Sequence, residues 1–369
     1  MVDMHHICYP FTRNIGDDVQ NIPLMLTVAS KVKLIPRESI EQNVNNIKKL
    51  MLHGWISRNS FGTFNYSSFA SNSASLSIHI ADQRHLEGNW KDFFANCQHV
   101  YTRDLYTLEL MRSAGIKAKF SGCLTMLYGD LFNGASDQGY ILCTERKYLN
   151  KLKGHRVIYH DPTNTPRYIQ FNTAMRIAFT LAWISVIANA SMVVSDRLHT
   201  LMPAVSLGKR VIFPNIEGQS QPTGPICRFS GLKEIFMPRK ALENRLALKN
   251  ILENYMYKAM EEIGIFRELG ELRSSSSPIS DCKAAYEKVI AAIDMTENSS
   301  QPLEQAYHIG HRMLFDTVTF LGFRSFDCLP LFMKEDQTLV ESITDPLISS
   351  SIKNRDRDIY WIGEPGSKF

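Results

Sequence analysis

Short apolar runs alternate with helix-like segments along most of the chain, and this alternation restricts the possible folds more than any other feature. Parallel strands are joined by crossovers that usually contain a helix, so the pattern predicts βαβ units and a parallel sheet. One run, Leu76–Ile80, alternates apolar and polar residues as a half-buried strand does. The other predicted strands are His6–Pro10, Gln98–Thr102, Tyr140–Thr144, Arg156–His160, Ser191–Ser195 and Val211–Pro214.

Two of the predicted helices have boundary residues with a clear physical role. Asp104 is expected to cap the helix Asp104–Ala114, and Gly115 suits the position after its last turn. Pro203 is expected within the first turn of a helix over Thr200–Leu207, where its missing N–H costs little. The other predicted helices are Val19–Ser30, Arg167–Asn189, residues 240–270 and Asp281–Met295.

A stretch rich in Gly, Asn, Ser and Asp at Asn133–Gly139 separates the predicted strands into two groups. The chain has 369 residues, which exceeds the usual size of one compact domain. We therefore predict an α/β protein with an N-terminal domain over residues 1–135 and a second domain over residues 136–296. Residues 297–369 are predicted to form a helical or irregular C-terminal extension.

The composition excludes several classes of protein. The net charge is only +4, and no dense Lys/Arg block with interleaved aromatics occurs, so no nucleic-acid partner is predicted. The seven cysteines are scattered without a C-x-x-C pair, and the start MVDMHHICYP lacks the features of a signal peptide. Both observations favour a cytoplasmic protein. The apolar stretch 174–194 contains Arg176 and Asn189, which predicts a buried helix and a strand rather than a membrane span.

Three polar clusters follow predicted strands: the loop segment Asn14–Ile15–Gly16–Asp17–Asp18, the pair Arg103–Asp104, and Ser195–Asp196–Arg197–Leu198–His199. Ligands of open parallel sheets bind at the carboxyl ends of strands, so these clusters are the candidate site. Arg84–His85, which follows Leu76–Ile80, is a secondary candidate for contact with an anion. His5, His6 and His53 lack metal-ligand spacing with carboxylates, and no metal site is predicted.

The cluster Ser195–His199 combines a strand end, a guanidinium, an imidazole and a helix N-terminus. Helix N-termini and arginine both bind phosphate or carboxylate, and histidine transfers protons near neutral pH. In an extended loop Arg197 and His199 would project to the same side. The alternative is a solvated loop in which Arg197 pairs with Asp196. For Arg103–Asp104 the alternative is a helix cap beside a structural salt bridge.

Four stretches together resemble the polysaccharide pyruvyl transferase family. They are NIGDDVQNIP near the start, YTRDLYTLELMRSAGIKAKFSGCLT, SDRLHTLMPAVSLGKRVIFP, and CRFSGL at 227–232. The resemblance covers about residues 5–240. It implies a fold similar to GT-B glycosyltransferases, with two Rossmann-like domains whose parallel sheets face a cleft.

The resemblance also implies a reaction. Phosphoenolpyruvate, as co-substrate and without a further cofactor, would donate its enolpyruvyl group to two hydroxyls of a sugar, giving a cyclic ketal and phosphate. His199 and Arg197 match the catalytic motif, and Ser195, Leu198 and, across the cleft, Arg103 match donor-binding positions. The candidate acceptor-binding residues are Asn14, Gly16, Asp17 and Asp18.

Two other functions fit the same sequence. A GT-B glycosyltransferase would use Arg197 and the helix N-terminus to hold a nucleotide-diphospho-sugar. A non-catalytic glycan-binding protein would use the scaffold without His199 chemistry. The sequence leaves the acceptor sugar and the oligomeric state open, and a lipid-linked acceptor would require no more than peripheral contact with a membrane.

Overall fold

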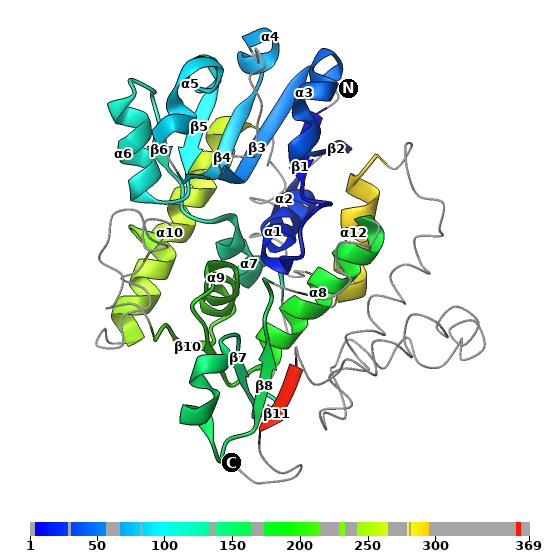
Figure 1. Ribbon diagram of the computed structural model, residues 1–369, viewed down its shortest axis with the longest axis vertical. Coiled ribbons are helices and arrows are strands. Elements are labelled where there is room, and N and C mark those ends of the chain that lie inside the picture. Colours follow the sequence, from blue (N-terminus) through cyan, green and yellow to red (C-terminus); the bar gives the residue numbers. More distant parts are fainter. Residues whose placement is uncertain are drawn as a thin grey trace, which may run out of the picture.

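The structure is a computed structural model that describes residues 4–28, 31–56, 67–81, 83–132, 137–163, 165, 173–214, 229–232, 242–264, 279, 282–294 and 359–362. Within these residues the chain forms an α/β protein with two sheets, one above the other in Figure 1. The predicted α/β class and its parallel sheets are confirmed. Among the helices that the structure describes, none combines the length and the hydrophobicity that a membrane span requires.

The first sheet is entirely parallel, with strand order β2-β1-β3-β4-β5-β6. This order places a topological switch point between β1 and β3, because the chain leaves β1 toward one side and continues with β3 on the other. The sequence analysis did not identify β2, β3 or β6. The strands are β1 (Met4–Cys8), β2 (Val32–Pro36), β3 (Lys49–Ile56), β4 (Ala74–Ile80), β5 (His99–Thr102) and β6 (Lys119–Phe120).

The second sheet has the strand order β10-β9-β7-β8-β11. Its four parallel strands, read as β8-β7-β9-β10, repeat the order β2-β1-β3-β4 of the first sheet, and β11 is an antiparallel edge strand beside β8. Its switch point lies between β7 and β9. The edge strand β11 belongs to the extension that was expected to be helical or irregular; the other residues of 297–369 lie outside the described residues. The strands are β7 (Ile141–Cys143), β8 (Val157–His160), β9 (Met192–Val194), β10 (Arg210–Ile212) and β11 (Ile359–Ile362).

Helices cover both faces of the first sheet and fill the space between the two sheets (Figure 1). One hydrophobic cluster extends from Met4, Met51 and Leu76 of the first sheet to Leu142 and Val193 of the second. The helices are α1 (Ile15–Val19), α2 (Asn21–Thr27), α3 (Ile40–Asn43), α4 (Ser67–Ala70), α5 (Gly88–Asn96), α6 (Leu105–Ser113), α7 (Tyr128–Leu131), α8 (Thr173–Asn189), α9 (Leu198–Ser206), α10 (Leu242–Ile263) and α12 (Cys282–Ala292). Short 3-10 turns are η1 (Arg37–Ser39), η2 (Val44–Asn46), η3 (Gln83–Leu86), η4 (Leu124–Leu127) and η5 (Arg146–Leu152).

Two late helices pack against the first sheet although they follow the second in sequence. Glu262 of α10 accepts hydrogen bonds from Tyr101 of β5 and from Lys119 of β6, the latter at 2.5 Å. Ile293, just after α12, forms a parallel bridge with Val32 of β2. The chain therefore returns to the first sheet after completing the parallel strands of the second.

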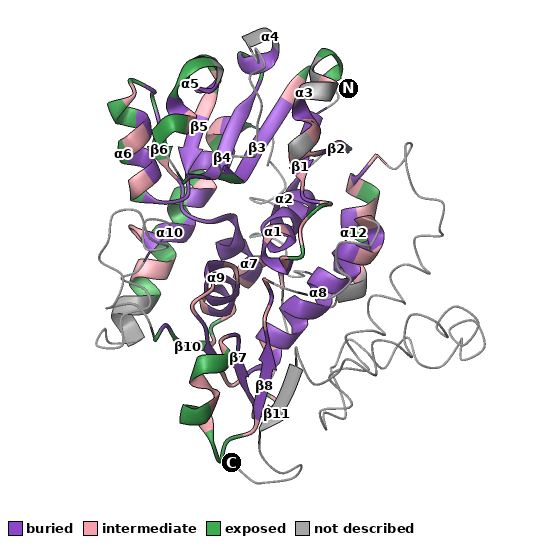
Figure 2. Cartoon of the chain, viewed as in Figure 1, coloured by how far each residue is buried: buried purple, intermediate pink, exposed green. Residues whose placement is uncertain are grey.

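Strand β4 is buried along its whole length, and the prediction of a half-buried strand was wrong (Figure 2). Its polar residues Ser75, Ser77 and His79 are buried because helices cover both faces of the sheet. The strand contains a register shift between Ser75 and Ile78, where Ser77 has a φ of 57°. That left-handed conformation is uncommon for a residue with a side chain, and the backbone N–H of Leu124 donates to its hydroxyl at 3.1 Å.

Helix boundaries differ from the prediction at two prolines. The expected helix Val19–Ser30 is interrupted at Gln20, and Pro23 lies in the first turn of α2, where no N–H donor is needed. Helix α9 begins at Leu198, so Pro203 is its sixth residue. The prediction that Pro203 lies in the first turn was wrong. Proline has no N–H to donate to the carbonyl four residues earlier, which here is that of His199.

Candidate active site

The structure brings all three predicted polar clusters together between the two sheets. Nη1 of Arg103, at the carboxyl end of β5, lies 3.3 Å from Nε2 of His199 in α9. A Cβ placed on Gly16 of α1 would lie 3.3 Å from Cβ of His199, so the N-terminal loop contacts the same imidazole. Arg103 and His199, which are 96 positions apart in sequence, are therefore in contact, and Gly16 lies beside the same histidine.

Arg103 is buried, with 2% of its side chain exposed. Its backbone N–H donates to Ile78 of β4 at 2.8 Å, which fixes its position at the sheet edge. A guanidinium can only donate hydrogen bonds, so Nε2 of His199 is the acceptor and the imidazole carries its proton on Nδ1. The Nε atom of Arg103 lies 3.8 Å from Asp104 and is otherwise without a hydrogen-bond partner. A buried cation with so little compensation is suited to an anionic ligand.

Asp104 performs the capping role that the sequence predicted. Its Oδ1 accepts the backbone N–H of Thr107 at 2.8 Å, and Gly115 follows α6 with a φ of 82°. Its Oδ2 lies 2.7 Å from Nδ1 of His79, which comes from β4. Asp104 thus fixes the start of α6 and connects the ends of β4 and β5 beside Arg103.

Arg176 of α8 stabilises the loop after β1 through hydrogen bonds. Its Nη2 donates to the carbonyl of Tyr9 at 2.7 Å and to Asp18 Oδ2 at 2.5 Å, and Nη1 donates to the carbonyl of Thr12 at 3.3 Å. Asp18 is therefore engaged in a buried ion pair with Arg176. The arginine that interrupts the apolar stretch of the sequence has this structural role.

Asn14 and Asp17 form the part of the loop nearest to Gly16. Asn14 caps α1, because its Oδ1 accepts the N–H of Gly16 at 3.0 Å, and its Nδ2 donates to Asp17 at 3.2 Å. Burial raises the pKa of Asp17 to about 6, although hydrogen bonding to Thr12 and the charge of Arg37 oppose the shift. The carboxyl group can consequently exchange a proton near neutral pH.

The segment Ser195–His199 is ordered by contacts with the end of β7. Ser195 Oγ accepts the N–H of Arg197 at 2.9 Å and lies 2.5 Å from the hydroxyl of Thr144. Nε of Arg197 forms an ion pair with Glu145 at 2.7 Å, whereas Asp196 pairs with Lys147 at 2.7 Å. The alternative in which Arg197 pairs with Asp196 is wrong. Burial raises the pKa of Glu145, and the positive charge of Arg197 opposes that shift.

The prediction that Arg197 and His199 project to the same side assumed an extended loop, and this assumption was wrong. Because α9 already begins at Leu198, Arg197 reaches Glu145 while His199 reaches Arg103. The N-cap residue of α9, Arg197, makes no side-chain capping hydrogen bond. Leu198 packs in a hydrophobic cluster with Met126 and other residues, so only its backbone can face a ligand.

Glu145, Tyr9 and Arg37 were not singled out from the sequence. Glu145 follows β7 at the second switch point, and Tyr9 and Arg37 follow β1 and β2. The guanidinium of Arg37 lies over the Tyr9 ring, 5.0 Å from its centroid. The signal that could have found Arg37 is its place directly after the apolar run Val32–Pro36.

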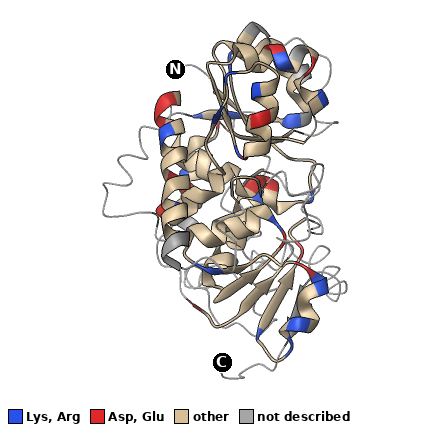
Figure 3. Cartoon of the chain, turned by 90° about the vertical axis from the view of Figure 1, so that its left-hand side faces the viewer, with Lys and Arg blue, Asp and Glu red and all other residues tan. Residues whose placement is uncertain are grey.

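Charged groups and histidines elsewhere have other surroundings. In Figure 3 most of the second sheet is free of charged residues, and β7, β8 and β9 contain none. His6 and His53 lie in the core with ring centroids 6.4 Å apart, and burial lowers the pKa of both, that of His53 to about 3. Within the described ranges, no group of three or more His, Cys, Asp or Glu could hold a metal ion. Arg84 and His85 lie in η3, and their contact with an anion stays a prediction.

Comparison with known proteins gives one family. The model of the polysaccharide pyruvyl transferase family matches residues 40–213, a range that contains Arg103 and Ser195–His199. The N-terminal loop and residues 227–232, which also carried the resemblance, lie outside the matched range. The comparison with curated proteins gave no match. The family match confirms the resemblance over residues 40–213, and a family of this kind implies a transferase.

Proposed function

Because the matched range is that of a transferase family, we propose that the protein transfers the enolpyruvyl group of phosphoenolpyruvate to two hydroxyls of a sugar. Both hydroxyl oxygens bond to C2 of the enolpyruvyl group, and the bond from C2 to the phosphate oxygen breaks. One hydroxyl proton is transferred to the methylene carbon, which becomes a methyl group, and the other leaves with phosphate. The observation that carries the proposal is the contact between Arg103 and His199.

The donor has two anionic groups, and the site offers cationic partners from both sheets. Arg103 comes from the first sheet, and Arg197 and the uncapped amino end of α9 come from the second. Helix N-termini and guanidinium groups both stabilise phosphate, including the charge that develops as it departs. The ion pair with Glu145 holds Arg197 at the switch point of the second sheet.

His199 is the proposed group for proton transfer. It lies between Arg103, which fixes its tautomer, and Gly16, whose missing side chain lets the N-terminal loop approach Nδ1. Correctly placed acid–base groups accelerate such reactions by about 10²–10⁴-fold. Asp17, whose pKa is about 6, is placed on the acceptor side, where it can take the proton of a sugar hydroxyl.

The proposal includes a GT-B arrangement with an acceptor domain over residues 1–135 and a donor domain over residues 136–296. Two observations support this division. The parallel strands of the two sheets have similar orders, and their carboxyl ends approach each other at Arg103 and His199. The return of α10 and α12 to the first sheet connects the two parts. Phosphoenolpyruvate is a co-substrate in this scheme, and the arginine side chains neutralise its charge.

The test is phosphate release from phosphoenolpyruvate in the presence of simple pyranosides, with mass analysis of the sugar product. His199→Gln is expected to lower kcat/KM by about 10²-fold or more, while the exposed control His155→Gln leaves it unchanged. A product that lacks the pyruvyl ketal would contradict the proposal. Turnover of nucleotide sugars by the same site would instead support the glycosyltransferase alternative.

A further inference from the structure

We propose that Trp55 is the platform on which the pyranose ring of the acceptor stacks. The inference rests on the proposed function, because it requires a sugar acceptor at the carboxyl edge of the first sheet. The residues involved are Arg37, Tyr9, Trp55, His79 and Arg103, which we call the edge row. Trp55 was not among the residues singled out from the sequence.

The edge row lies at the carboxyl ends of five neighbouring strands of the first sheet, in the order β2, β1, β3, β4 and β5. Nη1 of Arg37 donates to the carbonyl of Trp55 at 3.0 Å, passing over the ring of Tyr9. On the other side Trp55 is in register with His79, which contacts Asp104 beside Arg103. Trp55 therefore occupies the middle of the row, between Arg37 and the arginine that contacts His199.

Trp55 is the exposed aromatic residue of this row. It is 42% exposed, whereas Tyr9 and Arg103 are each only 2% exposed. An indole combines a large apolar surface with a polar N–H, and tryptophan is enriched at interfaces for this reason. The C–H groups on one face of a pyranose ring present a flat apolar surface that matches an aromatic ring.

An irregularity in the backbone of β3 precedes Trp55 and positions it in the edge row. The register with β4 shifts between His53 and Gly54, and Gly54 has a φ of 86°. A side chain at Gly54 would overlap the Tyr9 hydroxyl, which donates to the carbonyl of His53 at 3.0 Å. The bulge and Tyr9 together fix the backbone of β3 immediately before Trp55.

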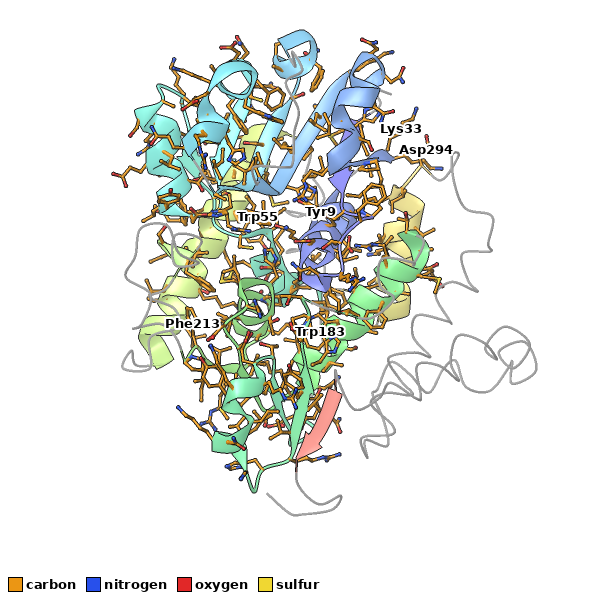
Figure 4. All side chains as sticks on the ribbon, in the orientation of Figure 1. Tyr9, Lys33, Trp55, Trp183, Phe213 and Asp294 are labelled. Carbon is orange, nitrogen blue, oxygen red and sulfur yellow. The ribbon has the colours of Figure 1, made fainter. Side chains whose placement is uncertain are left out.

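The position agrees with the topology and with the charges around it. Trp55 is one of the last two residues of β3, and Tyr9 directly follows β1; these strands flank the switch point, and Figure 4 shows both side chains between the two sheets. Ligands of such sheets bind in the crevice at the switch point. The guanidinium of Arg37, which contacts the Trp55 carbonyl and lies over the Tyr9 ring, supplies a cationic donor beside the platform.

The first experiment measures phosphate release at saturating phosphoenolpyruvate against the concentration of methyl pyranosides of glucose, galactose and mannose. Trp55→Ala is expected to raise the KM for the pyranoside about tenfold or more, with kcat changed by less than about threefold. Trp55→Phe should be intermediate, and the KM for phosphoenolpyruvate should stay unchanged. Tyr255→Ala, at a position of α10 that is 48% exposed, is the control and should match the wild type. An unchanged pyranoside KM in Trp55→Ala would overturn the inference.

A second measurement does not depend on turnover. Titration with the same pyranosides should produce a saturable change of tryptophan emission in the wild type that is absent in Trp55→Phe. An equal change in both proteins, or none in the wild type, would overturn the platform. If phosphoenolpyruvate is neither bound nor consumed while the emission of Trp55 still responds to pyranosides, the donor chemistry fails and the sugar site stands.

Discussion

At the scale of single residues, the candidate site depends on the side chains of His199, Arg103 and Arg197. Residues from distant parts of the chain surround each of them. His199 is fixed by Arg103 and by the bare backbone at Gly16, and Arg197 is fixed by Glu145. Each contact joins a strand end to a residue of another strand–helix unit. These side chains are therefore placed before any ligand arrives, which reduces the reorganisation needed during reaction.

Asp17 gives a prediction about stability and pH. Its pKa is about 6 in the folded protein against an ordinary value of 3.8, so the folded state binds more protons between these values. Stability should consequently fall as pH rises through this window. Asp17→Asn removes the ionisation and should gain stability relative to the wild type, by up to about 3 kcal/mol near pH 7 and by little near pH 4.

Urea unfolding of both proteins across this pH range provides the measurement. Asp92→Asn, at an exposed position of α5, is the control and should follow the wild type at every pH. A difference between Asp17→Asn and the wild type that stays constant with pH would contradict the burial of an ionisable carboxyl group at this position.

At the scale of elements, the pattern of apolar runs predicted seven of the strands because their composition and spacing are local properties. It missed the bulges of β3 and β4, which arise from packing against Tyr9 and Leu124 rather than from strand propensity. The boundary of α9 also escaped it, since a proline normally marks the first turn. The burial of β4 could not be read from its alternation, because it depends on helices that arrive from elsewhere.

Gly54 tests the bulge of β3. A Cβ there would overlap the hydroxyl of Tyr9 and lie 3.2 Å from its Cζ, in addition to the strain of a φ of 86°. Gly154 has a nearly identical φ of 85° and open space around it, so Gly154→Ala reports the strain alone. Thermal or urea unfolding should show a loss of about 1 kcal/mol for Gly154→Ala and about 3 kcal/mol or more for Gly54→Ala. Equal losses would mean that Tyr9 moves aside freely.

At the scale of the whole molecule, two parallel sheets share a hydrophobic cluster, and their carboxyl edges meet at Arg103 and His199. The sequence predicted the three polar clusters because strand ends are local features, and it also gave the family resemblance that the family match confirms. It could not show that the clusters converge, which depends on how α1, α8 and α9 pack between the sheets. Nor could it separate Asp18, which forms a buried ion pair with Arg176, from Asp17, which accepts a hydrogen bond from Asn14.

The central claim is that an anionic three-carbon donor is held between the two sheets by Arg197 and Arg103. Its most direct test is the melting temperature of the wild type and of Arg197→Ala, each with phosphoenolpyruvate and with several nucleotide sugars. Phosphoenolpyruvate at a hundred times its dissociation constant should stabilise the wild type by about 2.7 kcal/mol, and Arg197→Ala should lose this effect. Stabilisation by a nucleotide sugar alone, or equal stabilisation of both proteins by phosphoenolpyruvate, would contradict the account.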